Sequence, residues 1–273
     1  MTADPFSLTT ADMPPLWEGR FYDRIGSTSD EALAQVRAGA ITQPTLFLTD
    51  EQTAGRGRGR AAGSWTSTAG NLAVSFVYFP TSPVRDWPAL SYVAGLVLAR
   101  ALEEDCGFPA DQIRLKWPND VFVAGGKVAG LLLETATAPG GRQALVLGMG
   151  LNIEAAPALD RPDYVARDLR ALGYGGTGRD LVVSLIRRWA EAVELFDRNQ
   201  AGPRKQLFRD WQAHALYLNE EITVRIDQDR EERGTFIGLD ESNGALKLVT
   251  TSGQLRTVLA GDVMLAAASA GKS

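Results

Sequence analysis

The spacing of hydrophobic residues changes along the chain and divides it into two parts. Up to about residue 216, short apolar runs alternate with longer amphipathic stretches, whereas later apolar and polar positions alternate between Gly-containing turns. The first pattern is typical of strands mixed with helices, and the second of a small all-β unit. We therefore predict one domain over residues 1–216, a second over 217–268 and a short tail over 269–273.

The apolar runs of the first domain predict strands, because β-branched and aromatic residues are frequent in them. The predicted strands cover about residues 19–25, 45–52, 71–79, 113–117, 121–134 (as two strands) and 144–153. Gly125 and Gly126 divide the run 121–134 and indicate a hairpin turn. Since strands and helices alternate irregularly, we expect an α+β fold with a mixed sheet covered by helices, not a parallel doubly wound sheet.

Helical spacing predicts four helices in the same domain. They cover about residues 28–38, 86–105, 178–199 and 203–214. Thr28 and Glu31 have the spacing of a capping box at the start of the first helix, and Gly39 would end that helix. Residues 1–16 contain three prolines and are expected to form a loose leader.

The second domain contains short strand-like segments separated by glycine turns. They read EEITVRI, EERGTFIGLD, GALKLVT, GQLRTVL and GDVMLA. Five short strands at such close spacing predict a small β-barrel.

Composition narrows the range of functions. The 273 residues carry a net charge of -5, whereas a nucleic-acid-binding domain is usually basic, so DNA or RNA is not expected as the main partner. The single cysteine, Cys106, excludes an internal disulfide, and the single histidine, His214, excludes a His-rich metal site. These counts, with no long apolar run and no signal-peptide pattern, lead us to expect a cytoplasmic protein without a membrane partner.

One segment alternates glycine with arginine: TDEQTAGRGRGRAAGSW, residues 49–65. Glycine lets backbone N–H groups turn toward an anion, and arginine adds permanently charged bidentate donors. The segment matches neither a Walker phosphate loop nor the dinucleotide fingerprint. Taken alone, it is compatible with a solvated loop, an Arg-Gly nucleic-acid-binding segment or an anion-binding loop.

Two lysines stand beside unusual turns. Lys116 precedes the sequence WPND, in which Pro118 ends the strand and makes Asn119 and Asp120 project from a rigid turn. Lys127 follows the Gly-Gly turn and precedes an apolar strand. Taken alone, each stretch is better explained as a plain turn with a solvated lysine.

Taken together and in order, six motifs resemble the biotin–protein ligases. They are GSTSDEA, EQTAGRGRGR, WTSTAGNL, LKWPND, GKVAGLLLE and GMGLNI, and they cover about residues 20–155. The chain resembles the monofunctional type, without an N-terminal DNA-binding domain, so a repressor role is not expected. The resemblance implies a mixed sheet of the class II synthetase and biotin ligase kind, and the GDV near 261–263 resembles the family's SH3-like C-terminal barrel.

The resemblance also implies a reaction in two steps. The biotin carboxylate attacks the α-phosphate of ATP to give biotinyl-5′-AMP and pyrophosphate, and a lysine of an apo biotin carboxyl carrier protein then attacks the mixed anhydride. The substrates would be ATP and biotin with Mg²⁺, and the partner would be the carrier of acetyl-CoA carboxylase or a related biotin carboxylase. A homodimer is compatible with this assignment. Two alternatives stay open: lipoate or octanoate transfer on a related fold, and an Arg-Gly nucleic-acid-binding protein.

Matching the motifs residue by residue implies roles for the polar side chains. The biotin-binding residues would be Ser27, Thr28, Ser29, Gln52, Arg56, Gly57, Arg58, Lys127 and Gly130. The nucleotide-binding residues would be Arg56, Arg58, Trp65, Lys116, Asn119 and Asn152. Of these groups, Lys127 and Arg58, together with Asp120, would take part in catalysis, and no metal ligands are assigned.

The chain departs from the family pattern in three places. Ser29 stands where the family has an asparagine, and about two extra residues separate the Gly-Arg loop from Trp65. No basic residue stands just after Leu265, where some relatives carry an arginine. Octanoyl transfer commonly uses a cysteine, but Cys106 lies in no recognisable motif.

Overall fold

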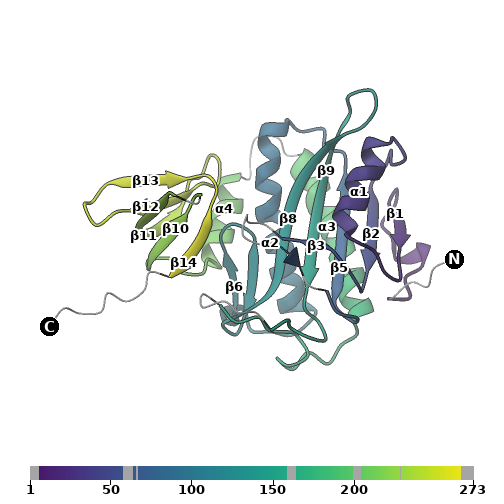
Figure 1. The fold of residues 1–273 in the computed structure, drawn as a ribbon, viewed down its shortest axis with the longest axis horizontal. Helices are drawn as coiled ribbons and strands as arrows, with labels where there is room; N and C mark the ends of the chain where they lie inside the picture. The colour runs from purple at the N-terminus through teal and green to yellow at the C-terminus, as the bar shows by residue number, and fades with distance from the viewer. Residues whose placement is uncertain are drawn as a thin grey trace.

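The centre of the protein is a seven-stranded sheet (Figure 1) in a computed structural model that describes residues 6–57, 64–65, 67–158, 164–198, 204–227 and 229–265. Its strands run in the order β1 (Glu18–Phe21), β2 (Thr45–Thr49), β5 (Leu72–Tyr78), β9 (Gln143–Leu151), β8 (Gly126–Thr137), β7 (Asp120–Val123) and β6 (Ile113–Lys116). The pair β1–β2 is parallel and the other neighbours are antiparallel. The predicted mixed sheet is therefore confirmed.

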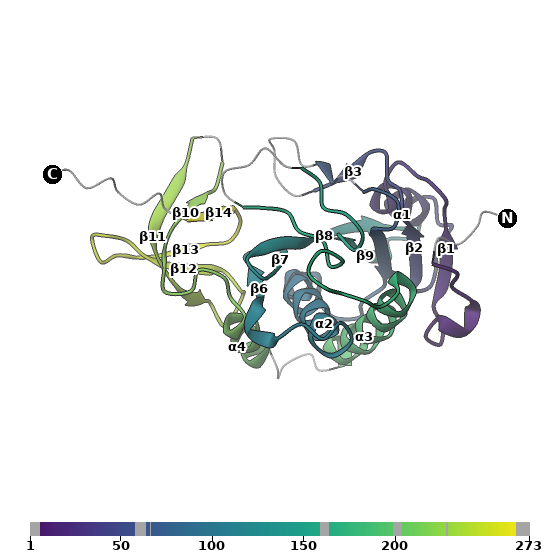
Figure 2. The same cartoon turned by 90° about the horizontal axis from the view of Figure 1, so that it is seen from below.

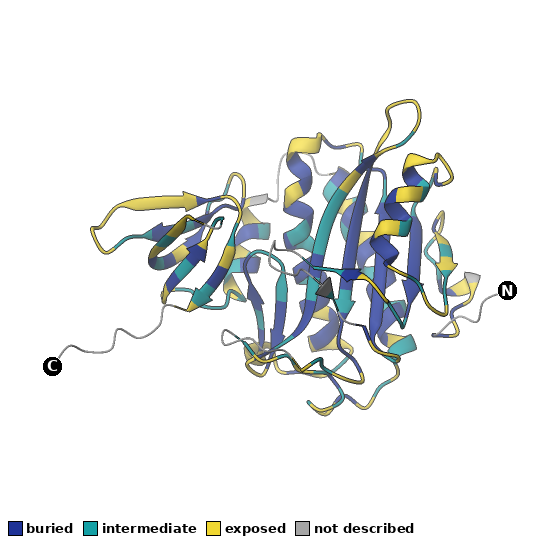
Figure 3. Ribbon diagram, in the orientation of Figure 1, coloured by how far each residue is buried: buried dark blue, intermediate teal, exposed yellow. Residues whose placement is uncertain are grey.

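Helices cover both faces of this sheet (Figure 2). Helix α1 (Thr28–Arg37) lies on one face, and α2 (Leu90–Glu104) and α3 (Gly178–Arg198) lie on the other. Helix α4 (Arg204–Ala213) follows α3, and short 3-10 helices occupy Thr10–Asp12, Val84–Ala89 and Ala110–Gln112. The strands between these layers are largely buried (Figure 3), as the continuous apolar runs of β5 and β9 require.

Each face of the sheet has its own apolar core. On the α1 side, Ala32, Leu33 and Val36 pack with Phe47 and Val77. The larger core on the other side joins α2, α3 and α4 to the sheet and to the C-terminal strands. The apolar side of the predicted first helix therefore faces the sheet.

The predicted cap of α1 is wrong by one residue. Ser27, not Thr28, is the N-cap, because the Ser27 Oγ accepts from the Asp30 N–H at 3.3 Å. Thr28 is the first helical residue, and its hydroxyl bonds Gln52 and Ser75. A capping-box spacing cannot tell these two uses of a hydroxyl apart.

The N-terminal segment is also more ordered than predicted over its described part. Phe6 and Leu8 are buried, and the Asp12 carboxylate contacts Arg179 of α3 at 2.8 Å. Hydrogen bonds from Thr9, followed by the Arg179 charge, lower the pKa of Asp12. Residues 1–5 and the predicted tail over 269–273 lie outside the described residues.

The C-terminal strands form a five-stranded antiparallel sheet of the SH3-like kind. Its strands run in the order β13 (Leu255–Val258), β12 (Leu246–Val249), β11 (Glu231–Leu239), β10 (Glu221–Arg225) and β14 (Asp262–Leu265). The predicted fold class is confirmed by this sheet together with the mixed sheet. A further two-stranded ribbon pairs β3 (Gly55–Arg56) with β4 (Ser64–Trp65).

The chain leaving α4 is hydrogen-bonded along β6 of the larger sheet. The Leu115 N–H donates to the His214 carbonyl at 2.8 Å, and the Leu216 N–H donates to the Leu115 carbonyl at 2.9 Å. Nearby, the Trp117 indole N–H donates to the Tyr92 hydroxyl at 3.0 Å, and that hydroxyl donates to the carbonyl of Gly244. The turn that follows Lys116 is thus tied to the C-terminal sheet. None of the helices in the described ranges is long and apolar enough to cross a membrane.

Candidate active site

A cavity of about 450 Å³ opens between the large sheet, the β3–β4 ribbon and the C-terminal sheet. It gathers thirteen of the site residues predicted from the sequence. They are Ser27, Thr28, Ser29, Gln52, Arg56, Gly57, Trp65, Lys116, Asn119, Asp120, Lys127, Gly130 and Asn152. Arg58, the remaining predicted residue, and Arg60 lie outside the described residues.

A neutral hydroxyl cluster borders one side of the cavity: Thr28, Ser29 and Gln52 line it, and Ser75 lies behind them. The Ser75 Oγ lies 2.8 Å from Thr28 Oγ1 and 2.9 Å from Ser29 Oγ. The Gln52 Oε1 accepts from the backbone N–H and the hydroxyl of Thr28, at 2.8 and 3.1 Å. The three hydroxyl residues are buried, so their mutual bonds satisfy polar groups that would otherwise be costly to bury.

The first arginine of the Gly-Arg segment is already engaged by carboxylates. Arg56 makes a bidentate contact with Glu134 at 2.8 and 2.5 Å, and its Nε lies 2.8 Å from Asp30 Oδ1. The hydrogen bonds to Glu134 raise the pKa of Arg56. An incoming anion would have to share this guanidinium with two carboxylates or replace them.

Lys127 points into the cavity instead of into solvent. Its Nζ lies 2.7 Å from Asp120 Oδ1, and only 15% and 16% of the two side chains are exposed. The hairpin register places them on neighbouring strands, because Asp120 opposes Gly130 and Phe122 opposes Lys127. A plain turn with a solvated lysine, the interpretation favoured by each stretch alone, does not describe this pair.

Lys116 is a second buried cation of the cavity, 5% exposed. Its Nζ lies 5.1 Å from the ring centroid of Tyr164, and the Nζ of Lys127 lies 5.2 Å from the same centroid. We call Lys116, Lys127, Asp120 and Tyr164 the lysine end of the cavity. It combines two positive charges with one negative charge and one aromatic face.

Two asparagine side chains use their amide N–H groups for structure. Asn119 donates to the Leu131 carbonyl, and Asn152 donates to the Arg167 carbonyl at 3.1 Å. Asn152 is 2% exposed, and its Oδ1 has no hydrogen-bond partner among the described residues. A buried acceptor without a partner on a cavity wall is suited to an N–H donor of a ligand.

Three glycines, Gly130, Gly148 and Gly150, form a bare floor beneath the cavity. A Cβ on Gly150 would lie 2.2 Å from Trp65 Cε2, one on Gly130 3.3 Å from Trp65 Cζ3, and one on Gly148 2.5 Å from Ser29 Oγ. Gly130 opposes Gly150, and Leu132 opposes Gly148. A Cβ on Gly130 would also lie 3.6 Å from Lys127 Nζ and 3.7 Å from Asp120 Oδ1, so the floor borders the lysine end at Gly130 and the hydroxyl cluster at Gly148.

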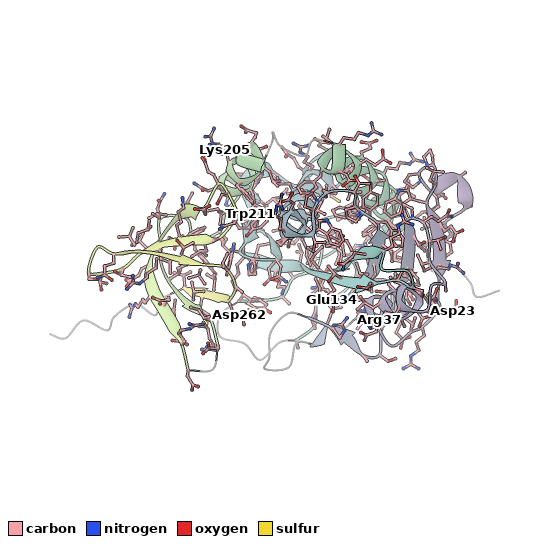
Figure 4. The ribbon with its side chains drawn as sticks, turned by 90° about the horizontal axis from the view of Figure 1, so that it is seen from above. Asp23, Arg37, Glu134, Lys205, Trp211 and Asp262 are labelled. Atoms are coloured by element: carbon pink, nitrogen blue, oxygen red, sulfur yellow. The ribbon has the colours of Figure 1, made fainter. Side chains whose placement is uncertain are left out.

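Several residues in and around the cavity were not predicted as site residues. Tyr164, Arg225 and Asp262 line it, and Ser75 and Glu134 lie behind Thr28 and Arg56. Ser75 is hidden in an apolar strand, and Arg225 lies in the C-terminal sheet, with Asp262 on the side that faces the large sheet (Figure 4). Arg225 belongs to a different domain from the predicted motifs, so no local pattern could have identified it.

Cys106 and His214 do not line this cavity. Burial raises the pKa of the Cys106 thiol to about 12, so the thiolate needed for a nucleophile is disfavoured at neutral pH. This counts against acyl transfer through a cysteine.

Comparison with known proteins gives consistent results. Residues 21–152 match the model of the biotin/lipoate A/B protein ligase family, and residues 217–265 match the biotin protein ligase C-terminal domain. A Mycobacterium tuberculosis protein named biotin–(acetyl-CoA-carboxylase) ligase is 34% identical over 239 residues, 88% of this chain and 85% of that protein. A Paracoccus denitrificans protein of the same name is 36% identical over 240 residues, 85% and 94% of the two chains.

A solved structure has a similar fold over nearly the whole chain. The biotin protein ligase from Aquifex aeolicus, in complex with biotin and ATP, has a TM-score of 0.69 and 27% identity. The similarity covers 91% of this chain and 96% of that one.

Proposed function

The chain belongs to the biotin protein ligase family and is an ATP-dependent biotin ligase, and we propose that the cavity between its two sheets holds both substrates. The observation that carries this proposal is the glycine floor, because it borders a neutral hydrogen-bonding cluster at Gly148 and a charged cluster at Gly130 within one cavity. Biotin has a neutral polar ring and a charged tail, and this arrangement is complementary to both.

In the adenylation step, we propose that the hydroxyl cluster binds the biotin ring and that Lys127 faces its carboxylate. A carboxylate oxygen bonds to the α-phosphorus of ATP while the bond to the leaving pyrophosphate breaks. Lys127 and Lys116 offset the charge of the two anions, which otherwise repel each other. Lys127 acts here as an electrostatic stabiliser and forms no covalent bond.

The nucleotide would extend toward Asn152 and Trp65. The Oδ1 of Asn152, which accepts no hydrogen bond from the described part of the chain, is a suitable acceptor for the exocyclic amine of adenine. Trp65 supplies an aromatic face over Gly150, against which a planar base or the adenylate can pack. Asn119 supports this end by holding β8 at Leu131.

We propose that Mg²⁺ enters with ATP. The described residues contain no group of three or more metal-ligating side chains, but Mg²⁺ commonly keeps several waters and binds one or two carboxylates plus phosphates. Asp120 and Asp262 line the cavity and fit such a site. The ion would neutralise phosphate charge.

Asp120 is proposed to hold the metal in the first step or to accept the proton of the incoming amine in the second. Replacing Asp120 by Asn separates the two roles. Slower pyrophosphate release indicates a role in adenylation, whereas a loss of transfer alone indicates a role toward the amine.

The Gly-Arg segment is proposed to close over the adenylate and exclude water. Arg58 would contact the intermediate, and Gly57 borders the cavity at the start of the segment. The variant Arg58→Ala is expected to release free biotinyl-5′-AMP faster than wild type. Unchanged release would argue against this role.

The acceptor is proposed to be a lysine of an apo biotin carboxyl carrier domain, as the names of the relatives suggest. We also propose a domain boundary at residues 216/217, supported by the linker beside β6. A cytoplasmic location, the absence of a nucleic-acid partner and a possible homodimer stay predictions from the sequence.

The proposed function is tested by two measurements on the full chain. Pyrophosphate release should require biotin, ATP and Mg²⁺ together, and labelled biotin should then appear on the carrier lysine. Competition with lipoate tests the alternative substrate, which should not displace biotin at equal concentration. Absence of transfer by the folded, Mg²⁺-supplied protein would overturn the proposal.

A further inference from the structure

Tyr164 occupies an unusual position between two cations. The Nζ atoms of Lys116 and Lys127 lie 5.1 and 5.2 Å from its ring centroid. The ring also contacts Phe122 edge-on, with centroids 5.9 Å apart and planes at 74°. One aromatic ring therefore serves two ammonium groups that come from different strands, β6 and β8.

The backbone beside Tyr164 is fixed to Lys127. The Lys127 N–H donates to the Val165 carbonyl, and the Arg167 N–H donates to the Lys127 carbonyl, both at 2.9 Å. The Arg167 carbonyl in turn accepts from the Asn152 side chain. These bonds give the segment after Tyr164 a defined register on β8, so the ring position is set by main-chain pairing.

The ring of Tyr164 stabilises the positive charges of the lysine end. Two neighbouring ammonium groups repel each other, and the Nζ of Lys127 lies 2.7 Å from Asp120 Oδ1. The face of an aromatic ring attracts a cation within about 6 Å by ~0.5–2 kcal/mol, without adding a negative charge that would repel the substrate anions.

We propose that Tyr164 is a positioning residue that holds Lys116 and Lys127 toward one point of the cavity before the substrates enter. This proposal rests on the proposed adenylation at this site. The aromatic face of Tyr164, not its hydroxyl, then determines how fast the biotin carboxylate reacts with ATP. The lysines would then need little rearrangement when the carboxylate and the α-phosphate meet.

The test varies the electron density of the ring at constant shape. Tyr164→Phe is compared with 4-fluoro-, 3,5-difluoro- and 3,4,5-trifluorophenylalanine at position 164, and single-turnover pyrophosphate release is measured with biotin and ATP. Tyr164→Phe should lie within about 2-fold of wild type, and each added fluorine should lower the rate further, because fluorine weakens cation–π attraction. Tyr164→Leu should be about 10-fold slower than Tyr164→Phe.

Matched controls separate this effect from simple packing. The same series at Tyr22, whose ring stacks on Phe47 on the α1 side, should leave the rate unchanged. Thermal unfolding of each variant checks the fold, and the fluorinated series keeps the test valid if Tyr164→Leu does not fold.

The outcomes are distinguishable from failure of the proposed function. If wild type releases no biotin-dependent pyrophosphate, the adenylation assignment itself fails. If wild type is active but the fluorinated variants all equal Tyr164→Phe, the positioning role is wrong. A Tyr164→Phe variant as slow as Tyr164→Leu would also overturn it, since the hydroxyl would then be the important group.

Discussion

The two ends of the cavity accommodate their polar side chains in different ways. In the hydroxyl cluster, Thr28, Ser29 and Ser75 bond one another and Gln52, without any formal charge. At the lysine end, Lys116 and Lys127 carry positive charges beside the Tyr164 ring, and Lys127 pairs with Asp120 at 2.7 Å. The first arrangement suits a neutral group of a ligand, whereas the second presents ammonium groups to which anions can bind. Substitutions at the first should therefore change affinity, and those at the second should change the reaction rate.

The largest effect is expected for Lys127→Ala. Removing a charge that stabilises the reacting groups typically costs ~100- to 1,000-fold in rate, so biotin- and ATP-dependent pyrophosphate release should fall by about that factor. Stopped-flow measurement at saturating biotin isolates the chemical step. Lys127→Arg serves as a control that keeps the charge but changes its geometry. Near-normal release by Lys127→Ala would remove the distinction between the two ends.

A matched pair on the glycine floor tests the boundary between the ends. Gly150→Ala places a Cβ against Trp65, and Gly148→Ala places one against Ser29. Overpacking of this kind typically costs ~1–3 kcal/mol, equivalent to about 5- to 150-fold in binding. Gly150→Ala should weaken ATP and adenylate binding, and Gly148→Ala should weaken biotin binding, as measured by calorimetry. Equal effects of both variants on both ligands would show that the floor is a single unit.

A smaller effect is expected for Thr28→Val at the hydroxyl cluster. The substitution keeps the shape but removes the hydroxyl that bonds Gln52 and Ser75. A neutral hydrogen bond contributes ~0.5–1.5 kcal/mol, so the Kd for biotin should rise about 2- to 10-fold while kcat changes little. Thr49→Val, in β2 and away from the cavity, is the control. A loss in kcat as large as that of Lys127→Ala would contradict the comparison.

The smallest effect on activity is expected for Glu134→Gln. This change removes one of the two carboxylates that engage Arg56, at a partly exposed site where ion pairs contribute about 1 kcal/mol or less. The free energy of unfolding should fall by about that amount in urea titration, with adenylation within about 2-fold of wild type. A clear gain in biotin affinity would instead show that Glu134 withholds Arg56 from the ligand.

Most of the fold was predictable because its elements are encoded locally. The apolar runs, the Gly125–Gly126 turn and the periodicity of α3 each identify an element without knowledge of its neighbours. The predictions were wrong where contacts with distant parts of the chain determine the local structure. Phe6 and Leu8 are buried only because of packing at a distance, and the cap at Ser27 was misplaced because Thr28 is used by Ser75, far along the chain.

The candidate site was predictable for a different reason. The stretches around Lys116, Asp120 and Lys127 can each be explained alone as a turn, and only their occurrence in an ordered set of motifs indicated a shared site. The ordered set indicates which motifs share a site, but it does not indicate which groups stabilise the charges of the lysines. Tyr164 reaches the site because residues 165–167 pair with β8, and Arg225 reaches it because of the position of the C-terminal sheet. Neither arrangement leaves a local pattern in the sequence.

The linker that follows α4 has a consequence for dissecting this enzyme. By pairing with Leu115, it covers the outer edge of β6, the strand that carries Lys116. A fragment that ends before His214 would expose that edge and its unpaired N–H and C=O groups, and such edges promote aggregation. The larger domain is therefore better expressed with residues 214–216 attached, and chimeras are better joined beyond residue 216 than within the linker.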